Sequence, residues 1–280
     1  MPIHRLFLPL LAALLLLGCK GSTPSPASPP SSPTPTPVLQ TDSFKYALTT
    51  PSGRCEIFVD YPVSGSPTLV GALRDFIKTT LFDDQSSTAP DDPAELVRAY
   101  VNRRQQSLSH SLSQMGVAAV DKRDAPEEGV DIRLVCTAPQ FVTYEVYRYS
   151  YITHGAHGEY SDYGVTFRRS DGRRMTHILN KVDEGLYQHI RHGLKSYFQV
   201  SSDQALADIC TVDLSLMPMP TFPPYLVADG VRFHYSIYDI CTFDDGDPSF
   251  TIPYALALPY MTDEARALVT SPFRQNATKP

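Results

Sequence analysis

The sequence predicts an α+β fold, in which helices pack on one side of a largely antiparallel sheet. Two observations lead to this fold class: strand-like and helix-like segments come in clusters rather than in strict alternation, and short turns join consecutive strands. The 280-residue chain is long enough for one large core or for two intimately associated halves. We place a smaller α/β half at residues 42–130 and a second half at residues 131–272.

The predicted elements of the first half are a hairpin and two helices. Aromatic and β-branched residues at 44–48 and 55–61 flank a Pro-Ser-Gly turn, which is typical of a strand pair. Apolar residues recur at helical spacing over residues 69–81, behind a Ser-Pro start. We expect this helix to cover the hairpin. A polar loop at 83–91 precedes a second helix, which begins with Asp-Pro-Ala-Glu and covers residues 92–115.

The second half has the strongest strand signals in the chain. Residues 132–136 and 141–152 are rich in β-branched and aromatic residues, and a partner strand follows at 160–168. An amphipathic helix at 186–198 and a smaller helix at 203–209 come next. The last predicted elements are the two strands of a hairpin with period-two alternation, residues 225–228 and 231–237.

The first residues are typical of a bacterial lipoprotein export signal. His4 and Arg5 precede an apolar run at 6–17, which is too short for a comfortable transmembrane helix. The Leu-Leu-Gly sequence before Cys19 resembles the lipobox, so we predict a signal peptide at residues 1–18 and acylation of Cys19. The alternative is a cleaved secretory signal that is followed by a stray thiol.

Residues 19–41 are the predicted lipid attachment and tether. Prolines recur between residues 21 and 37, which favours an extended backbone with little to bury. We therefore expect a cell-envelope location through the lipid on Cys19. Lys20 stands where an aspartate is often linked to inner-membrane retention, which favours the outer membrane. The net charge of -6 and the lack of a basic stripe exclude nucleic acid from the expected partners, and we expect no cofactor.

The other four cysteines favour structural disulfides, because their number is even and the chain is exported. They are Cys55, Cys136, Cys210 and Cys241. Three pairings are possible. We predict Cys55–Cys136, which lie in strand-like apolar runs, and Cys210–Cys241, which bracket a proline-rich excursion. A zinc site is not expected because the chain has no CxxC pair.

The segment from His154 to Gly158 is the main candidate for chemistry. With Glu159 and Asp162, its two histidines would permit a metal-binding or acid/base role at a hairpin end. We favour a glycine-permitted turn, because the spacing fits no established zinc motif, and we predict no metal. His154 and His157 remain candidate ligand-binding residues. The aspartates near residue 245 are expected to form a solvated turn rather than a calcium site.

Three tyrosines are further candidate ligand-binding residues. Tyr147, Tyr149 and Tyr151 alternate onto one strand face, and Tyr144 lies on the other. An exposed tyrosine stripe would suit a glycan or protein partner. The interpretation we favour is that the stripe packs under a helix, because a long strand needs cover on one side.

A set of motifs in the second half carries a family resemblance, at residues 144–151, 155–158, 165–167, 171–173, 229–235, 238–240 and 252–254. These motifs resemble the extracytoplasmic domain of unknown function 3298, which occurs in the lysozyme-sensing anti-sigma factor and beside some polysaccharide deacetylase domains. Residues 59–62 and the helix after them resemble the smaller domain that often precedes it.

The resemblance implies an extracytoplasmic binding or sensing module with no catalytic residues to carry over. Its expected ligand is a cell-wall fragment, a glycan or a protein such as lysozyme. The chain also has no GxSxG elbow, HExxH helix, phosphate-binding glycine loop or nucleotide fingerprint, so we do not expect an enzyme. Two alternatives stay open: a metal-assisted or Ser/His hydrolase acting on a cell-wall polysaccharide, and a purely structural envelope component.

Overall fold

The structure, a computed structural model, describes residues 37–117, 121 and 124–270. The predicted signal peptide, Cys19 and most of the tether lie outside the described residues. The described residues belong to one compact unit. None of their helices is long and apolar enough to cross a membrane.

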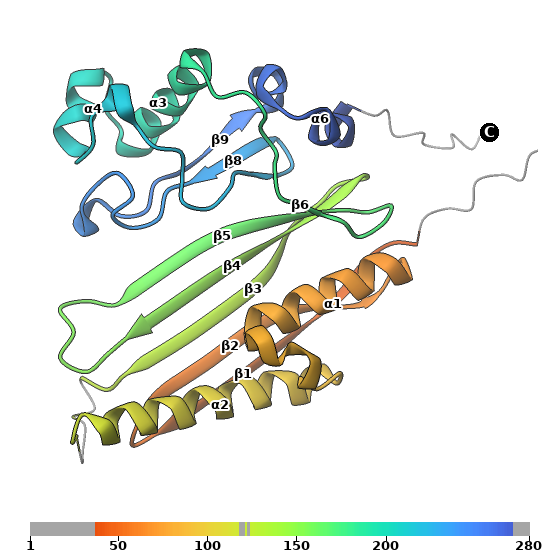
Figure 1. Ribbon diagram of the computed structural model, residues 1–280, viewed down its shortest axis with the longest axis vertical. Helices are drawn as coiled ribbons and strands as arrows, with labels where there is room; N and C mark the ends of the chain where they lie inside the picture. Colours follow the sequence, from red (N-terminus) through yellow and green to blue (C-terminus); the bar gives the residue numbers. More distant parts are fainter. Residues whose placement is uncertain (1–36, 118–120, 122–123, 271–280) are drawn as a thin grey trace, which may run out of the picture. The chain divides into compact units, whose positions relative to one another are not determined.

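The main sheet has six strands whose spatial order equals their order in the chain (Figure 1). They are β1 (Gln40–Thr50), β2 (Gly53–Ser64), β3 (Glu127–Thr137), β4 (Phe141–Tyr151), β5 (Glu159–Arg168) and β6 (Arg174–Met175). Neighbouring strands are antiparallel except β2 and β3, which are parallel because two helices cross over between them. The predicted α+β class with a largely antiparallel sheet is confirmed.

The crossover consists of α1 (Pro67–Phe82) and α2 (Pro93–Gln114), close to the predicted positions. Pro67 occupies the first turn of α1, where a missing N–H costs nothing. The Asp92 carboxylate accepts a hydrogen bond from the Glu95 N–H at 2.9 Å and so caps α2. The predicted loop between the helices contains a short 3-10 helix, η1 (Asp83–Thr88), because its serines and acidic residues allow a tight turn.

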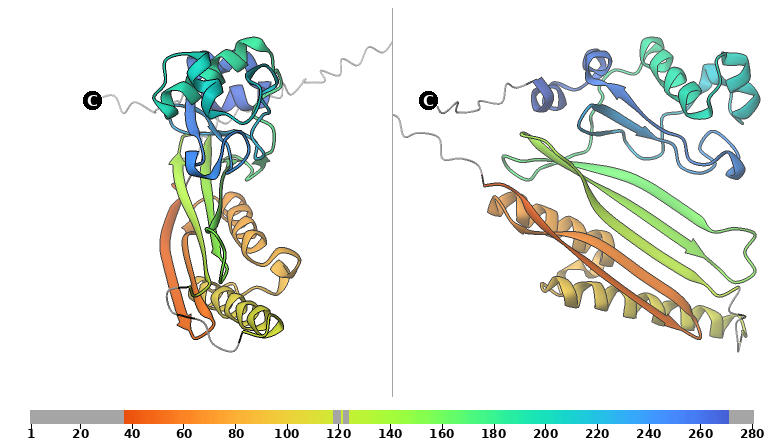
Figure 2. Two further views of the ribbon diagram at one scale, coloured as in Figure 1. Left: turned by 90° about the vertical axis from the view of Figure 1, so that its left-hand side faces the viewer. Right: turned by 180° about the vertical axis from the view of Figure 1, so that it is seen from behind.

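Both crossover helices cover the same face of the main sheet, as the end-on view in Figure 2 shows. Leu69, Leu73 and Ile77 of α1 are buried in one apolar cluster with Tyr144 of β4. Phe76 meets the Tyr144 ring edge-on, with centroids 6.3 Å apart. The face that carries Tyr144 is therefore the one that the helices cover, and its burial supplies much of the favourable free energy of folding.

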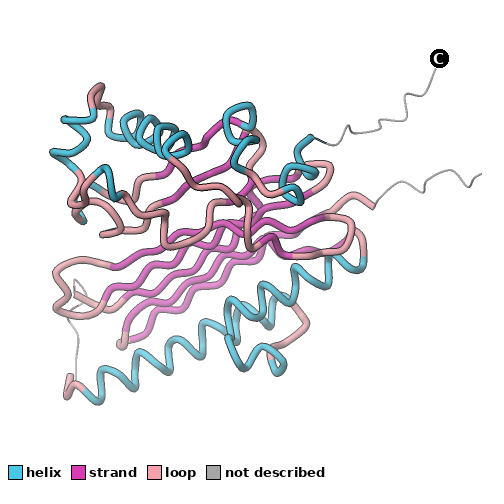
Figure 3. Tube along the Cα trace, turned by 45° about the horizontal axis from the view of Figure 1, so that its top comes forward, coloured by secondary structure: helices cyan, strands magenta, loops and turns pink. Residues whose placement is uncertain are grey.

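A second, three-stranded sheet and further helices form the C-terminal part (Figure 3). The strands are β7 (Tyr225–Leu226), β8 (Gly230–His234) and β9 (Ser249–Pro253). The helices are α3 (Glu184–Phe198), α4 (Asp203–Ile209), α5 (Tyr254–Ala257) and α6 (Asp263–Thr270), with short 3-10 helices at Leu214–Leu216, Phe243–Asp245 and Leu258–Tyr260. The predicted hairpin is confirmed, but its alternation does not separate buried from exposed residues, because β8 is covered on both faces.

The two sheets meet through buried hydrogen bonds. The Thr143 hydroxyl of β4 donates to the Leu226 carbonyl at 2.7 Å, and the Leu226 N–H donates to the Thr166 hydroxyl of β5 at 3.0 Å. A Cβ at Gly164 would lie 2.2 Å from the Tyr225 ring, so only glycine admits this contact. The β7–β8 hairpin thus packs on the face of β4 and β5 opposite the crossover helices.

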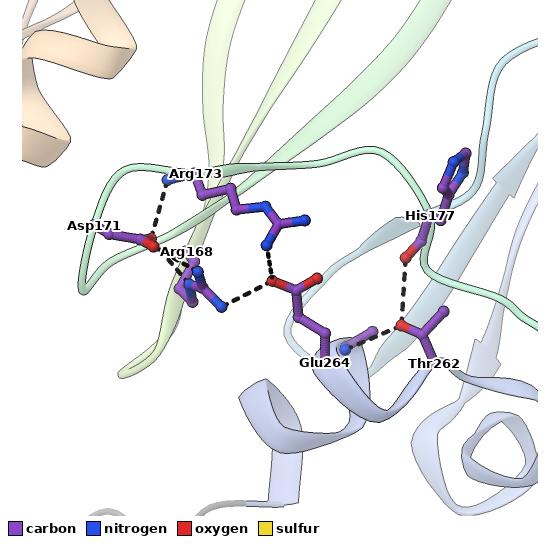
Figure 4. Close-up of polar contacts among 7 residues, drawn as sticks. Arg168, Asp171, Arg173, His177, Thr262 and Glu264 are labelled. Carbon is purple, nitrogen blue, oxygen red and sulfur yellow. Dashed lines mark hydrogen bonds and ion pairs between the residues drawn. The ribbon is translucent and has the colours of Figure 1, made fainter.

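Ion pairs join helix α6 to the end of β5 and to the turn that follows it (Figure 4). The Arg168 guanidinium binds Asp171 in the next turn and, at 2.8 Å, Glu264 of α6. Arg173 reaches the same Glu264 oxygen at 3.1 Å. The Thr262 hydroxyl accepts a hydrogen bond from the Ala265 N–H and so caps the helix.

The apolar residues form two clusters, one beneath the crossover helices and one beneath α3. The first contains residues from Leu39 to Phe167, and the second contains residues from Cys136 to Leu268. Residue 130, our predicted boundary, lies inside β3, and the ladder of the main sheet continues across it. Backbone hydrogen bonds therefore join the two predicted halves into one sheet.

All four described cysteines are free thiols, so the predicted disulfides are absent from the structure. For Cys55–Cys136 the strand register gives the reason. Cys55 lies opposite Glu128, and Cys136 is eight positions farther along β3, about 26 Å away at the rise of a strand. A disulfide requires Cα atoms within about 7 Å, so this pairing was wrong. Cys210 and Cys241 are closer, because the Thr211 N–H donates to the Ile240 carbonyl at 2.8 Å.

Candidate functional site

The predicted tyrosine stripe lies on the face of the main sheet opposite the crossover helices, beyond the part that the second sheet covers. Tyr147, Tyr149 and Tyr151 alternate with residues of the Tyr144 face, so they point away from α1 and α2. Tyr147 is 40% exposed, and the other two are half-buried. The expected packing of this stripe beneath a helix was therefore wrong. The helices cover the other face, which carries Val142, Tyr144 and Val146.

A cavity of about 300 Å³ lies beside Tyr147 and Tyr149. We call it the tyrosine pocket, and its lining residues are Arg54, Glu56, Glu127, Glu128, Gly129, Val130, Asp131, Tyr147 and Tyr149. Three adjacent strands build it, because Gly129 stands between Glu56 on β2 and Tyr149 on β4 in the register of the sheet. The missing side chain at Gly129 leaves the pocket floor open between its neighbours.

The charges of the tyrosine pocket are largely balanced. Three of its four carboxylates bind an arginine, and the pairs are Arg54–Glu56, Arg104–Glu128 and Arg133–Asp131, each with an N–O distance of 2.7 Å. The pocket thus offers paired donors and acceptors rather than a strong net field. Burial raises the pKa of the Tyr147 hydroxyl, and the nearby Asp247 carboxylate raises it further, so this group stays a neutral donor at physiological pH.

His157 belongs to an aromatic cluster next to the tyrosine pocket. Its ring stacks on Phe243 with centroids 3.8 Å apart, and its Nε2 lies 3.0 Å from the Tyr238 hydroxyl. Tyr160 connects this cluster to the stripe, since its ring lies 6.1 Å from Phe243 and 6.4 Å from Tyr147. The structure therefore brings His157 close to Tyr147.

His154 lies in a different environment from His157. The Asp124 carboxylate accepts hydrogen bonds from the His154 N–H at 3.1 Å and from the Tyr151 hydroxyl at 2.5 Å. The Tyr151 bond is the largest cause of the lowered pKa of Asp124. His154 has a positive φ of 64°, which a fixed turn tolerates in a histidine. The two histidines therefore do not converge, and the interpretation as an ordinary turn accounts for the observed contacts.

Asp162 contributes to a buried cluster that the sequence did not reveal. His234 of β8 lies between two carboxylates, with its Nδ1 3.8 Å from Asp162 and its Nε2 3.3 Å from Asp247. His234 is only 6% exposed, and one Asp162 oxygen is buried with no hydrogen-bond partner in the described part of the chain. The sequence held one signal for this cluster. Along the predicted strand, the charged or titratable Arg232 and His234 alternate with the apolar Val231 and Phe233, so they point to the opposite face.

Burial raises the pKa of Asp162 to about 6, because the charged carboxylate loses most of its hydration. His234 opposes the shift, and the carboxylates of Glu145 and Asp247 add to it. Glu145 itself accepts a hydrogen bond from the Tyr225 hydroxyl at 2.7 Å and lies 3.3 Å from Arg232. The junction of the two sheets is therefore a charged layer as well as an apolar one.

The described residues contain no group of three or more His, Cys, Asp or Glu side chains placed to hold a metal ion. In the acidic turn near residue 245, the Asp245 carboxylate accepts hydrogen bonds from the Thr242 N–H at 3.1 Å and from the Thr242 hydroxyl at 2.6 Å. This carboxylate serves as a turn cap in the structure.

No protein-family model matches the sequence, and no curated protein matches it significantly. Two solved structures are similar. A DUF3298 family member from Bacteroides fragilis NCTC 9343 has a TM-score of 0.65 and 21% identity, over 81% of this chain and 95% of that chain. A DUF3298 family protein from Pseudomonas aeruginosa PAO1 has a TM-score of 0.53 and 14% identity, over 83% of this chain and 97% of that chain. Over most of its length, this chain therefore has the fold of solved DUF3298 family members, as the motifs predicted.

Proposed function

We propose that this protein is a lipid-anchored envelope protein whose non-catalytic module binds a cell-wall glycan in the tyrosine pocket. The observation that carries the proposal is the pair Tyr147 and Tyr149 on the part of the sheet face that the second sheet does not cover, beside a cavity of about 300 Å³. That volume is at the lower end of the range for small-ligand pockets.

A sugar ring matches the chemistry of this pocket. Tyrosine offers a flat apolar face for the C–H groups of a sugar and a hydroxyl for its polar edge. The paired carboxylates and guanidinium groups provide acceptors and donors for sugar hydroxyls. A cationic protein surface such as that of lysozyme would favour unpaired carboxylates, whereas Glu56, Glu128 and Asp131 all have arginine partners.

The envelope location rests on the sequence alone. An acylated Cys19 and a proline-rich tether would hold the module outside the cytoplasm, with the outer membrane favoured by Lys20. Replacement of Cys19 by serine should release the protein from the membrane fraction, and retention of the variant there would contradict the anchor.

The hydrolase alternative has little support in the geometry. Within the described residues, no serine, threonine or cysteine side chain forms a hydrogen bond to a histidine ring nitrogen, as an activated nucleophile requires. The Thr262 hydroxyl binds only the backbone carbonyl of His177. His234, which has two carboxylate neighbours, is buried at the junction of the sheets and does not line the tyrosine pocket.

The proposal is tested by binding of the full-length protein to insoluble peptidoglycan, with a gel zymogram and a lysozyme pull-down in parallel. Tyr147→Ala and Tyr149→Ala should each reduce retention on peptidoglycan at least tenfold. Tyr197→Ala is the matched control, because Tyr197 is 38% exposed and lies outside the pocket. Clearing of the zymogram, capture by lysozyme alone, or equal retention of all variants would each overturn the proposal.

A further inference from the structure

A second cavity, of about 320 Å³, lies between α2 and the ends of β3, β4 and β5. We call it the arginine cavity, and its lining residues are Tyr100, Arg104, Glu128, Gly129, Arg148, Tyr149, Ser150, Glu159, Tyr160 and Ser161. Strand alternation places Arg148 and Ser150 on the face of β4 that carries Tyr144, which is the helix side of the sheet. The arginine cavity thus extends to the helix side of the sheet, and it shares Glu128, Gly129 and Tyr149 with the tyrosine pocket.

The arginine cavity contains hydrogen-bond donors that the protein does not use. Within the described residues, the Arg148 guanidinium makes one hydrogen bond, to the Thr80 carbonyl at the end of α1. It has five N–H groups, so most of them remain available. The hydroxyls of Tyr100, Ser150 and Ser161 have no hydrogen-bond partner in the same part of the chain. Tyr100 is only 6% exposed as a residue, but its hydroxyl is not fully buried, so water or a ligand in the cavity can reach it.

The charges around these donors define the kind of ligand that fits. Arg104 and Glu128 form a two-point ion pair and offset each other. Arg148 is then the one guanidinium of the cavity without a carboxylate partner in the described chain, and Glu159 is an exposed carboxylate at the rim. Arg148, Arg104 and Tyr100 line the same cavity, and both arginines act electrostatically on the Tyr100 hydroxyl.

We propose that the arginine cavity binds the carboxylate of a small ligand through Arg148, with hydrogen bonds from the hydroxyls of Tyr100, Ser150 and Ser161. A planar guanidinium matches a carboxylate geometrically, and Arg148, which has no ion-pair partner among the described residues, can pair with a monoanion. Glu159 disfavours a dianion such as phosphate, because it adds negative charge at the rim. The cavity exceeds the volume of acetate, so the carboxylate belongs to a larger molecule, such as a sugar acid or a short peptide.

Binding is measured by isothermal titration of the full-length protein with sodium acetate, sodium glucuronate, alanyl-alanine and inorganic phosphate. Glucuronate or alanyl-alanine should bind more tightly than acetate and identify the source of the carboxylate, and phosphate should bind most weakly. Arg148→Gln should weaken carboxylate binding at least tenfold. Arg98→Gln is the matched control, since Arg98 is exposed on the same helix as Tyr100 and does not line the cavity.

Two further variants keep the test independent of folding. Tyr100→Phe combined with Ser161→Ala removes two hydroxyls, retains the ring of Tyr100, and should weaken binding several-fold. Glu159→Gln should strengthen binding several-fold, because it removes the repulsion at the rim. Absence of binding by every carboxylate, preference for phosphate, or equal affinity of Arg148→Gln and Arg98→Gln would overturn the proposal. The Tyr147→Ala variant should bind the same carboxylates normally, so failure of the glycan proposal is distinguishable.

Discussion

Replacement of Asp162 by asparagine should stabilise the protein at neutral pH and leave its stability at pH 4 almost unchanged. The carboxylate lies at the junction of the sheets, 3.8 Å from His234, with one buried oxygen that has no hydrogen-bond partner among the described residues. Asparagine has nearly the same shape and carries no charge to desolvate. Its amide also provides donors, for which Glu145 and Asp247 are nearby acceptors.

The sign of the effect follows from the direction of the pKa shift. Folding raises the pKa of Asp162 from its ordinary value of 3.8 to about 6, so the folded protein binds this proton more tightly than the unfolded chain. The free energy of unfolding therefore falls as the pH rises from about 4 to about 6, and this contribution is constant above that range. A shift of about two units corresponds to at most about 3 kcal/mol. Because the side chain keeps 25% exposure, we expect about 1–2 kcal/mol.

Urea unfolding at pH 4 and at pH 8 measures the difference. Asp162→Asn should exceed the wild type in free energy of unfolding by about 1–2 kcal/mol at pH 8 and by less than about 0.5 kcal/mol at pH 4. Asp75→Asn, at an exposed position on α1, is the matched control and should show no such pH dependence. A variant that is less stable than the wild type at pH 8, or a gain of equal size at both pH values, would refute the reasoning.

Three other substitutions or treatments test the packing and the covalent state. Gly193→Ala should destabilise the protein by about 1–3 kcal/mol in urea, because its Cβ would lie 2.1 Å from the Phe250 ring; an unchanged midpoint would contradict this close contact. Glu264→Gln should lower the free energy of unfolding by about 0.5–1 kcal/mol at low salt and by much less in 1 M salt. A loss of stability that does not depend on salt concentration would exclude an ionic origin. After oxidation, non-reducing peptide mapping should find Cys210 linked to Cys241, whereas free thiols at both positions would disprove that pairing.

Local signals in the sequence were sufficient for the positions of most elements. Residues close in the sequence determine the Asp-Pro start of α2, the helical spacing in α1 and the turn before β2. A short stretch of sequence is therefore enough to predict each of these features. Helix α4 occupies the predicted residues 203–209. The 3-10 helix η1 was missed because a short polar segment can satisfy its backbone within itself or in water with little difference in free energy.

Contacts between distant segments were harder to predict. The choice between the faces of β4 failed because tyrosine suits a core and an exposed surface equally, so the stripe alone did not decide which side the helices cover. The first half of β4 did contain a signal for the choice of face. Thr143 and Glu145 make the stripe face more polar there than the face that carries Val142 and Val146. The Cys55–Cys136 pairing failed because register is set by strand pairing over the whole sheet.

The lengths of the elements explain why the far half of β4 remains open on the stripe face. Its eleven residues extend about 36 Å, whereas the five-residue strands of the second sheet extend about 17 Å. The second sheet therefore covers the half that carries Thr143 and Glu145, and Tyr147 to Tyr151 project beyond it. On the opposite face, the sixteen residues of α1 extend about 24 Å, which leaves the same end of the sheet to α2 and the arginine cavity. Strand β4 is longer than the second sheet on one face and longer than α1 on the other. Both candidate binding surfaces therefore lie at the same end of the main sheet.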